Sequence, residues 1–186
     1  MPKTGIAYAV VSPNSPADYT TVQAAIDALE KSIFVKAGKT VAGWNQNQNA
    51  VEVHTGPGVT VSSGINITGN NCSLILGPGT TVSGEIDVTT GVEAYIECMN
   101  GCTLQNIDIN TARCYINGGG WGTVATTSTA VLDAQSGADV IFENISANVS
   151  ADFTVRQSTR TVFRLIRFTA NGGGADVFSY TYAGTD

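Results

Sequence analysis

The cysteines and the histidine are the residues whose chemistry matters first. The cysteines are Cys72, Cys98, Cys102 and Cys114. Cys98 and Cys102 could supply half of a metal site, but His54 is the single histidine of the chain and completes no ligand cluster. We therefore predict no metal site and no cofactor, and we expect free thiols that pack as small apolar side chains.

Charge is distributed unevenly along the chain. Its 186 residues carry 9 Lys and Arg against 15 Asp and Glu, a formal net charge of −6, and this acidic balance does not favour nucleic acid. Four arginines nevertheless fall within a stretch of twelve residues that contains no acid: Arg156, Arg160, Arg164 and Arg167. They predict either a solvated edge or a contact patch for an acidic surface on a subunit or partner.

The polar stretch Trp-Asn-Gln-Asn-Gln-Asn at 44–49 allows two interpretations. Its amides could bind sugar, with the ring of Trp44 as a stacking platform. Alternatively, the stretch is a solvated or subunit-facing loop that bulges from the body of the protein. We favour the loop.

A repeat must position these residues. Residues 51–67 align with residues 72–88 at an offset of 21, and each segment contains a Gly-Pro-Gly turn. One column of the alignment holds Ile65, Ile86 and Ile107. Each is followed by a polar and then an apolar residue, which is typical of a short strand with one buried face. The period resumes at 141–147, which 162–168 match 21 residues later.

A period near 20 residues that is filled with strands predicts a parallel β-helix, because each repeat must stack on the next to bury its apolar face. We expect an all-β, single-stranded, right-handed β-helix of about six turns. The same offset places Cys72, Glu93 and Cys114 in one column. The β-helix domain would span 18–186, after an extended arm at 1–17.

Both ends of the chain carry candidate contacts. In the arm, Ile6, Tyr8 and Val10 are candidates for binding a neighbouring subunit or another protein. In the tail, 175–182 reads as a strand that closes the last turn or pairs with a neighbouring subunit. Its aromatic residues, also contact candidates, are Phe178, Tyr180 and Tyr182.

Residues 18–31 form the one clear helix, which Thr20 or Thr21 can cap. Its apolar face consists of Val22, Ala25, Ile26 and Leu29. A β-helix has an open end with unpaired strand edges, and we expect this helix to cover it. Residues 33–38 would be the first strand of the coil.

The segment Tyr-Thr-Thr-Val-Gln-Ala-Ala-Ile-Asp-Ala at 19–28, followed by Ile-Phe-Val-Lys-Ala-Gly at 33–38, resembles the entry of pectin-lyase-like β-helix proteins. That superfamily includes pectinesterases, pectate lyases and many phage tailspike and virion proteins. The resemblance implies the fold and, through its phage members, a homotrimer. Chemistry has to be argued from a site.

The resemblance also points to a residue to test for catalysis. Residues 137–144 are similar to the pectinesterase segment that carries the nucleophilic Asp, which would place that role on Asp139. Glu143 stands where that family has a Gly, no Gln-Asp pair lies one turn earlier, and the family's Arg-Pro-Trp segment is missing after Arg160. We therefore assign no catalytic residue and expect Asp139 to be a turn residue.

Pectate lyases require calcium-binding carboxylates and a basic residue on one face. Acids from stacked turns that could cluster are Glu85, Asp87, Glu93 and Asp108. Asp87 and Asp108 each lie between two inward residues, so we expect them to point outward. No basic residue lies near enough in register to serve as the base.

We therefore expect a non-enzymatic structural protein of a phage virion, assembled as a homotrimer, and most simply a capsid decoration or cement protein. It would be made in the host cytoplasm and bind the major capsid protein or another virion protein. No signal sequence or membrane-spanning apolar run is present, so we expect neither export nor membrane contact. The alternatives are a tail appendage or tailspike module, or a carbohydrate-active, pectinesterase- or lyase-like enzyme that binds polysaccharide.

Overall fold

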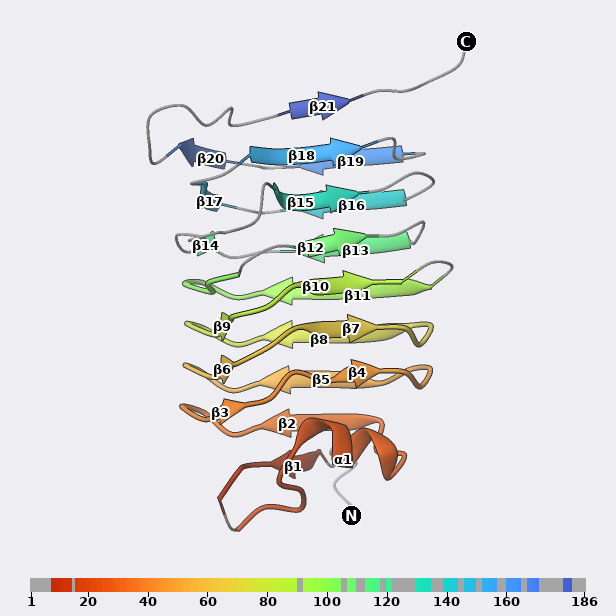
Figure 1. Cartoon of the computed structure of the whole chain (residues 1–186), viewed down its shortest axis with the longest axis vertical. Helices are drawn as coiled ribbons and strands as arrows, with labels where there is room; N and C mark the ends of the chain where they lie inside the picture. The colour runs from red at the N-terminus through yellow and green to blue at the C-terminus, as the bar shows by residue number, and fades with distance from the viewer. Residues whose placement is uncertain are drawn as a thin grey trace, which may run out of the picture.

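In a computed structural model, the chain winds into a parallel β-solenoid (Figure 1). The structure describes residues 8–14, 16–89, 92–104, 107–109 and 113–117 in full, and from residue 120 onward the backbone and register of the strands named below. Successive turns add parallel strands to the sheets that form the walls, so neighbours in space are residues one turn apart in sequence. The predicted parallel β-helix architecture is confirmed.

Two long sheets form the main walls of the solenoid. Sheet A has eight strands, in the order β1 (Ala9–Val11), β2 (Ser32–Val35), β5 (Glu52–Thr55), β8 (Cys72–Leu76), β11 (Glu93–Cys98), β13 (Arg113–Asn117), β16 (Asp139–Glu143) and β19 (Arg160–Arg164). Sheet C has seven, in the order β4 (Asn45–Gln46), β7 (Ile65–Ile67), β10 (Ile86–Val88), β12 (Ile107–Ile109), β15 (Ala130–Ala134), β18 (Asp152–Arg156) and β21 (Ser179–Thr181).

Two shorter sheets complete the wall between them. Sheet B contains β3 (Thr40–Val41), β6 (Thr60–Val61) and β9 (Thr81–Val82). Sheet D contains β14 (Gly120–Trp121), β17 (Ser146–Val149) and β20 (Arg167–Ala170). The later match between 141–147 and 162–168 is confirmed, because Ile141 pairs with Val162 and Ala147 with Phe168.

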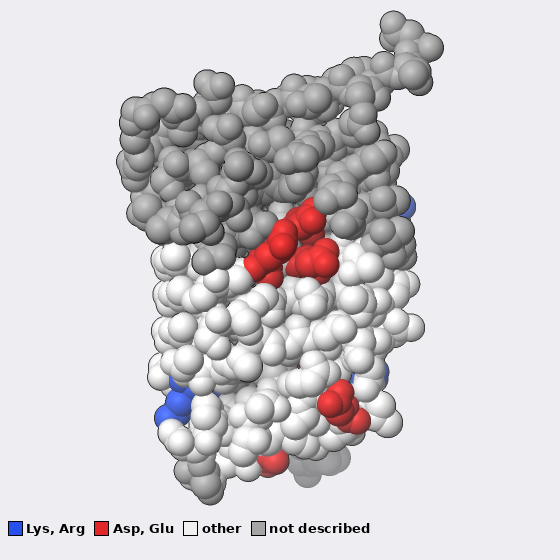
Figure 2. Space-filling model, viewed as in Figure 1, with Lys and Arg blue, Asp and Glu red and all other residues white. Residues whose placement is uncertain are grey.

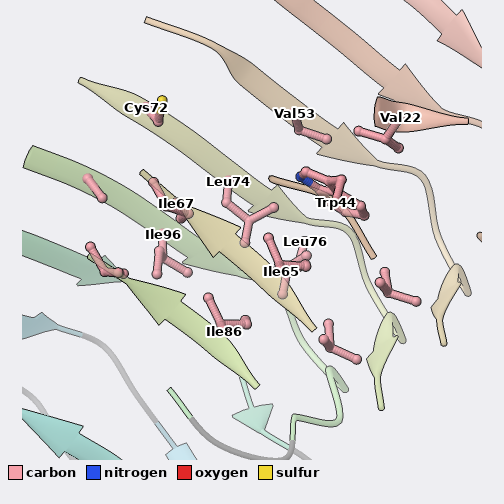
Figure 3. Close-up of a cluster of buried hydrophobic side chains, with 14 of the residues drawn as sticks. Val22, Trp44, Val53, Ile65, Ile67, Cys72, Leu74, Leu76, Ile86 and Ile96 are labelled. Carbon is pink, nitrogen blue, oxygen red and sulfur yellow. The ribbon is translucent and has the colours of Figure 1, made fainter. Parts of the chain in front are cut away.

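The core consists of stacked aliphatic columns. Ile65, Ile86 and Ile107 are register partners on consecutive strands of sheet C, and all three are fully buried, as the sequence predicts. Opposite them, sheet A contributes its own inward column: Ile33, Val53, Leu74, Ile96 and Ile116. Figure 3 shows side chains from the two sheets meeting in the interior. Each buried aliphatic side chain stabilises the fold by about 1.5–3 kcal/mol relative to exposure.

One predicted column is wrong. Cys72 and Cys114 lie on either side of Ala94, and Glu93 is instead the partner of Arg113. The connection before β11 is one residue longer than a 21-residue period allows. In a strand, a shift of one residue exchanges the inward and outward faces, so Glu93 points outward and Ala94 inward.

The Gly-Pro-Gly turns stack in the same way as the strands. The first glycine has no room for a side chain, since a Cβ on Gly77 would lie 2.3 Å from the carbonyl oxygen of Thr55. The last glycine adopts a left-handed conformation, with φ +65° at Gly58 and +68° at Gly79. The amide of Gly58 donates to the carbonyl of Pro78 one turn away, at 2.8 Å. The turn therefore needs glycine for two different reasons.

The predicted helix is shorter than expected: α1 spans Val22–Asp27 rather than 18–31. The Thr21 hydroxyl caps its start by accepting from the Ala24 amide at 3.1 Å, as predicted. Its end is a Schellman-type motif in which Glu30 donates to the Ala25 carbonyl and Leu29 to that of Ile26. Leu29 has φ +68° and is 68% exposed, so its predicted place on the apolar face is wrong.

Segments near the N-terminus bond to the outer edges of the first strands. The Val10 amide donates to the Asp18 carboxylate at 2.8 Å, and the Val10 carbonyl accepts from the amides of Asp18 and Tyr19. On sheet C, the Asn45 amide of β4 donates to the side-chain oxygen of Gln23 in α1 at 2.8 Å. These bonds engage the amide and carbonyl of Val10 at the edge of sheet A and the amide of Asn45 at the edge of sheet C. Within the predicted arm, Ala9–Val11 pair with β2 as part of sheet A.

Candidate functional site

The outward face of sheet A begins with an aromatic and ionic cluster. His54 Nε2 lies 2.7 Å from Glu52 Oε1, and the Tyr8 hydroxyl donates to the same oxygen at 3.3 Å. The Tyr8 ring meets the rings of His54 and Phe34 edge-on, with centroids 5.2 and 6.4 Å away. Burial, and then the neighbouring Glu52 carboxylate, raise the pKa of Tyr8. The contacts tie the start of the described chain to β2 and β5.

A shallow pocket of about 450 Å³ adjoins this cluster at the N-terminal end. Its lining comprises Tyr8, Ala9, Asp18, Tyr19 and Glu30. Both carboxylates are engaged, since Asp18 accepts from the Val10 amide and Glu30 accepts from the Tyr19 hydroxyl at 3.0 Å. These two bonds join β1 and the segments on either side of α1 around the pocket.

Farther along sheet A, two tyrosines stack on the outward face. The rings of Tyr95 and Tyr115 lie 5.5 Å apart and within 9° of parallel. The Tyr95 hydroxyl donates to Glu97 Oε2 at 2.9 Å. Burial is the main cause that raises the pKa of Tyr95. Both rings are partly exposed, so they form an aromatic ridge on the outward face of sheet A.

Charged residues beside this ridge alternate in sign from strand to strand. Glu93 Oε1 lies 2.5 Å from Arg113 Nη1. Arg113 is in register with Asp139, which is in register with Arg160. The interpretation of Asp139 as a turn residue is therefore wrong, because it begins strand β16 between two arginine positions. The ion pair of Glu93 and Arg113 favours this register, because opposite charges on adjacent strands attract.

The remaining arginines lie in different sheets. Arg164 is the register partner of Glu143 in sheet A. Arg156 ends β18 and pairs with Thr181, and Arg167 begins β20 and pairs with Ser146. The four arginines that are neighbours in sequence are thus spread over three sheets, and two of them lie opposite acids.

Sheet C presents an acidic outward face. Asn66, Asp87 and Asp108 are register partners, and Asp108 is in turn the partner of Asp133 on β15. Figure 2 shows the acidic side chains gathered on this side of the molecule. Asp87 and Asp108 alternate with buried residues, as the sequence predicts.

Asp87 is the chemically distinctive member of this acidic face. Its Oδ1 atom is buried and has no hydrogen-bond partner among the described residues. Burial raises the pKa of the Asp87 carboxyl. Glu85 precedes the same strand, whereas Glu93 lies in sheet A, so the four acids considered for calcium do not form one cluster. Within the fully described ranges, no group of three or more potential ligands is arranged to hold a metal ion.

The cysteines are packing residues. All four are buried and none forms a disulfide, as predicted. Burial raises the pKa of Cys102 to about 11 and that of Cys114 to about 12. Thiols with such pKa values are almost entirely protonated at neutral pH, so they are poor nucleophiles and poor metal ligands.

Both interpretations of residues 44–49 place Trp44 and Gln46 at the surface, and both are wrong for these two residues. Trp44 is 4% exposed and Gln46 is fully buried, and both belong to the interior at β4. Gln46 Nε2 donates to the carbonyls of Val51 and Ser73. Trp44 therefore cannot act as a stacking platform for sugar.

Other predicted contact residues are placed only in part. Val10 is the middle residue of β1, and Tyr180 is the register partner of Val155 on β18. Ile6, Phe178 and Tyr182 lie outside the described residues. α1 has six residues and is too short to cross a bilayer. The described ranges contain no helix that is long and apolar enough to do so.

The sequence could not reveal the surface columns, although their residues are visible in it. Tyr95 and Tyr115 are 20 residues apart, and Tyr115 and Ile141 are 26 apart. An alignment at a fixed 21-residue offset therefore does not place these register partners in one column. The alternation of buried and exposed positions within each strand was the available signal.

Comparison with protein-family models, curated proteins and solved structures gives no match for this chain.

Proposed function

We propose that the protein is a non-enzymatic structural component of a phage virion, most simply a homotrimeric capsid decoration or cement protein. One observation carries the proposal: described side chains that could take part in catalysis or binding stabilise the fold instead. The thiols and Trp44 pack in the core, Glu52 is held by contacts with Tyr8 and His54, and Glu93 forms an ion pair with Arg113. The resemblance of segments 19–28 and 33–38 to pectin-lyase-like proteins supplies the phage context.

The finer architecture belongs to the same proposal. The solenoid is right-handed, has about six turns, and is closed at its N-terminal end by α1. The hydrogen bonds from Asn45 to Gln23 and from Gln48 to the Ile26 carbonyl support such a cap. A rigid rod with one closed end suits a protein that must survive on a particle surface.

Purified particles test the proposal. Quantitative mass spectrometry of the virion should find hundreds of copies per particle if the protein decorates the capsid, and a handful if it is a tail part. Native mass spectrometry of the isolated protein should give three times the 19.2 kDa chain mass. Absence of the protein from particles would overturn the virion proposal, whereas a monomer in solution would overturn the trimer.

One observation favours the enzymatic alternative. Asp87 and Asp108 lie on adjacent strands, about 4.8 Å apart along the rod, and the pKa of Asp87 is raised, as a general acid requires. The protein can be incubated with pectin and surface polysaccharides and scored for reducing ends, unsaturated products and methanol. Activity that Asp87→Asn or Asp139→Ala abolishes would overturn the structural proposal, and no activity above buffer would sustain it.

A further inference from the structure

Two buried side chains of the first coil hold polar atoms that are not hydrogen-bonded to the protein. Trp44 is 4% exposed and Gln46 is fully buried. The indole Nε1 of Trp44 and the amide Oε1 of Gln46 have no hydrogen-bond partner among the described residues. Buried polar side-chain atoms nearly always have a partner from the protein or from ordered water, because their lost hydration is otherwise not replaced. Each of these two atoms therefore requires a partner.

The two side chains lie at the N-terminal end of an otherwise aliphatic part of the core. Gln46 on β4 is the register partner of Ile67, and the same column continues with Val88 and Ile109. Trp44 lies two residues before Gln46, and Figure 3 shows its ring inside the cluster of buried hydrophobic side chains. Polar atoms thus enter the core at the first coil, which is hydrogen-bonded to α1.

The orientation of the Gln46 amide is fixed by its donor side. Its Nε2 atom donates to the Val51 carbonyl at 3.3 Å and to the Ser73 carbonyl at 3.2 Å. Turning the amide over would place Oε1 against these two carbonyl oxygens, and three acceptors would then face one another. Oε1 must therefore stay on the opposite side of the amide group, where it needs a donor.

The indole of Trp44 offers the complementary group. Its Nε1–H is a donor only, and it belongs to a rigid ring that packs in the core. Both side chains are buried and come from positions two residues apart, a separation of about 6.6 Å along a strand. A water oxygen about 2.9 Å from each atom joins atoms that are up to about 5.8 Å apart. One molecule of this size is therefore able to bond to both side chains.

The two groups together select a neutral ligand that both donates and accepts. A cation would be attracted by Oε1 and repelled by the indole N–H, and an anion would meet the reverse. Neither Trp44 nor Gln46 carries a charge that would offset the desolvation of an ion. Water accepts from Nε1 and donates to Oε1, and two partners fall within the usual range of about two to four for a buried water.

We propose that one water molecule binds in the core beside β4, where it accepts a hydrogen bond from Trp44 Nε1 and donates one to Gln46 Oε1. The water joins two side chains of the first coil, so it is part of the folded core at the end that α1 contacts. Its exchange with solvent requires this end of the coil to open, because both side chains are buried. The site is independent of any role in a virion.

A crystal structure at a resolution that shows ordered water tests the site directly. We expect a water peak about 2.7–3.2 Å from both Trp44 Nε1 and Gln46 Oε1. A direct hydrogen bond between the two atoms would overturn the proposal. Separate partners for the two atoms, or no partner for either, would do the same.

Nuclear magnetic resonance tests for the same water in solution. The chain has two tryptophans, so a nitrogen-labelled indole gives two signals, and Trp44→Phe identifies the one from Trp44. We expect a nuclear Overhauser effect between the Trp44 Nε1–H and a long-lived water. A Trp44 signal without a water contact in the natural protein would contradict the proposal, and this measurement needs no folded variant.

A matched pair of variants tests the part played by Gln46. Gln46→Met keeps a similar volume and removes the acceptor, so the water contact of Trp44 should be lost. Gln48→Met removes a nearby amide that donates to the Ile26 carbonyl of α1, and it should leave the contact in place. A contact that survives in Gln46→Met, or that is lost equally in both variants, would show that Gln46 Oε1 does not hold the water.

Discussion

Two corners of the solenoid require a left-handed backbone, and the chain meets this requirement differently at each. One corner holds glycines with φ between +64° and +79°: Gly38, Gly58, Gly79 and Gly101. The other corner holds Leu29, Ala50 and Asn71, with φ of +68°, +56° and +56°. The residues at this second corner are spaced 21 apart, so it too recurs with the period of the coil.

The two corners also differ in how they are joined to the next turn. At the glycine corner, the hydrogen bonds to the next turn join backbone atoms: the Gly38 amide donates to the Pro57 carbonyl, and the Gly58 amide donates to the Pro78 carbonyl. At the second corner, the Ala50 amide likewise donates to the Asn70 carbonyl, and side chains add two bonds: Asn49 accepts from the Asn70 amide at 2.9 Å, and Asn70 accepts from the Glu93 amide at 2.7 Å. A Cβ added at Gly38 or Gly58 would meet nothing within 4 Å, so glycine is favoured there by its left-handed φ and not by lack of space, whereas the second corner holds the same conformation with Leu29, Ala50 and Asn71.

The largest expected effect comes from filling the closest approach at the glycine corner. Gly77→Ala puts a Cβ 2.3 Å from the Thr55 carbonyl oxygen, and backbone must move to relieve the overlap. We expect a loss of about 3 kcal/mol in the free energy of unfolding, measured by urea denaturation. A loss below that of Gly58→Ala would show that the turns are not closely stacked there.

Gly58→Ala separates conformational strain from crowding. A Cβ at Gly58 meets nothing within 4 Å, so its penalty is that of a left-handed non-glycine residue alone. We expect a loss of about 1–2 kcal/mol. For a chain of this size, that corresponds to a fall in Tm of about 2–8 °C, measurable by calorimetry.

Asn70→Ala tests the side-chain junction of the second corner. The substitution removes the acceptor of the Glu93 amide, and solvent replaces it because the site is exposed. We expect a loss of about 1 kcal/mol in the free energy of unfolding. Thr81→Ala, a partly exposed position in sheet B without this role, serves as the control, and an equal loss in both variants would contradict the junction.

Leu29→Asn should stabilise the protein. Leu29 is exposed and left-handed, so the change removes backbone strain without removing buried surface. Asn tolerates this conformation, and we expect a gain of about 0.5–1 kcal/mol, visible as a higher Tm. A loss of stability instead would mean that the Leu29 side chain stabilises the fold by a contact at the N-terminal end.

The smallest effects form a reciprocal pair. Ala50→Asn should raise the free energy of unfolding and Asn71→Ala should lower it, each by roughly 0.5 kcal/mol. Both positions are exposed and have the same φ of +56°, so they are matched controls for each other. Changes of the same sign would show that the two turns do not have equivalent corners.

The sequence predicts what depends on repetition and misses what depends on local length changes. The column of Ile65, Ile86 and Ile107 follows from an offset that is constant across those turns. The register partners of Cys72 and Glu93 do not follow from this offset, because one extra residue before β11 shifts the register. At 44–49 the amide-rich composition predicts exposure, but alternation along β4 turns Trp44 and Gln46 inward.

Surface recognition is harder to predict than the core for the same reason. Ile141 and Tyr115 are register partners although they are 26 residues apart in sequence, a separation that no repeat in the sequence indicates. The burial of the thiols could be predicted, because small apolar packing depends on the residue type and not on register. The exposure of Leu29 was not predicted, because Leu29 has the spacing of the apolar helix face but lies two residues beyond the end of α1.

The carboxylate of Asp18 has a consequence for the life of the protein at high concentration. Exposed strand edges recruit further strands and so seed fibrils. By occupying the Val10 amide, Asp18 removes the hydrogen-bond donor that an incoming strand would need at that edge of sheet A. Asp18→Ala frees this amide and leaves the backbone bonds of residues 18 and 19 to the Val10 carbonyl in place, so we expect it to increase aggregation at high concentration.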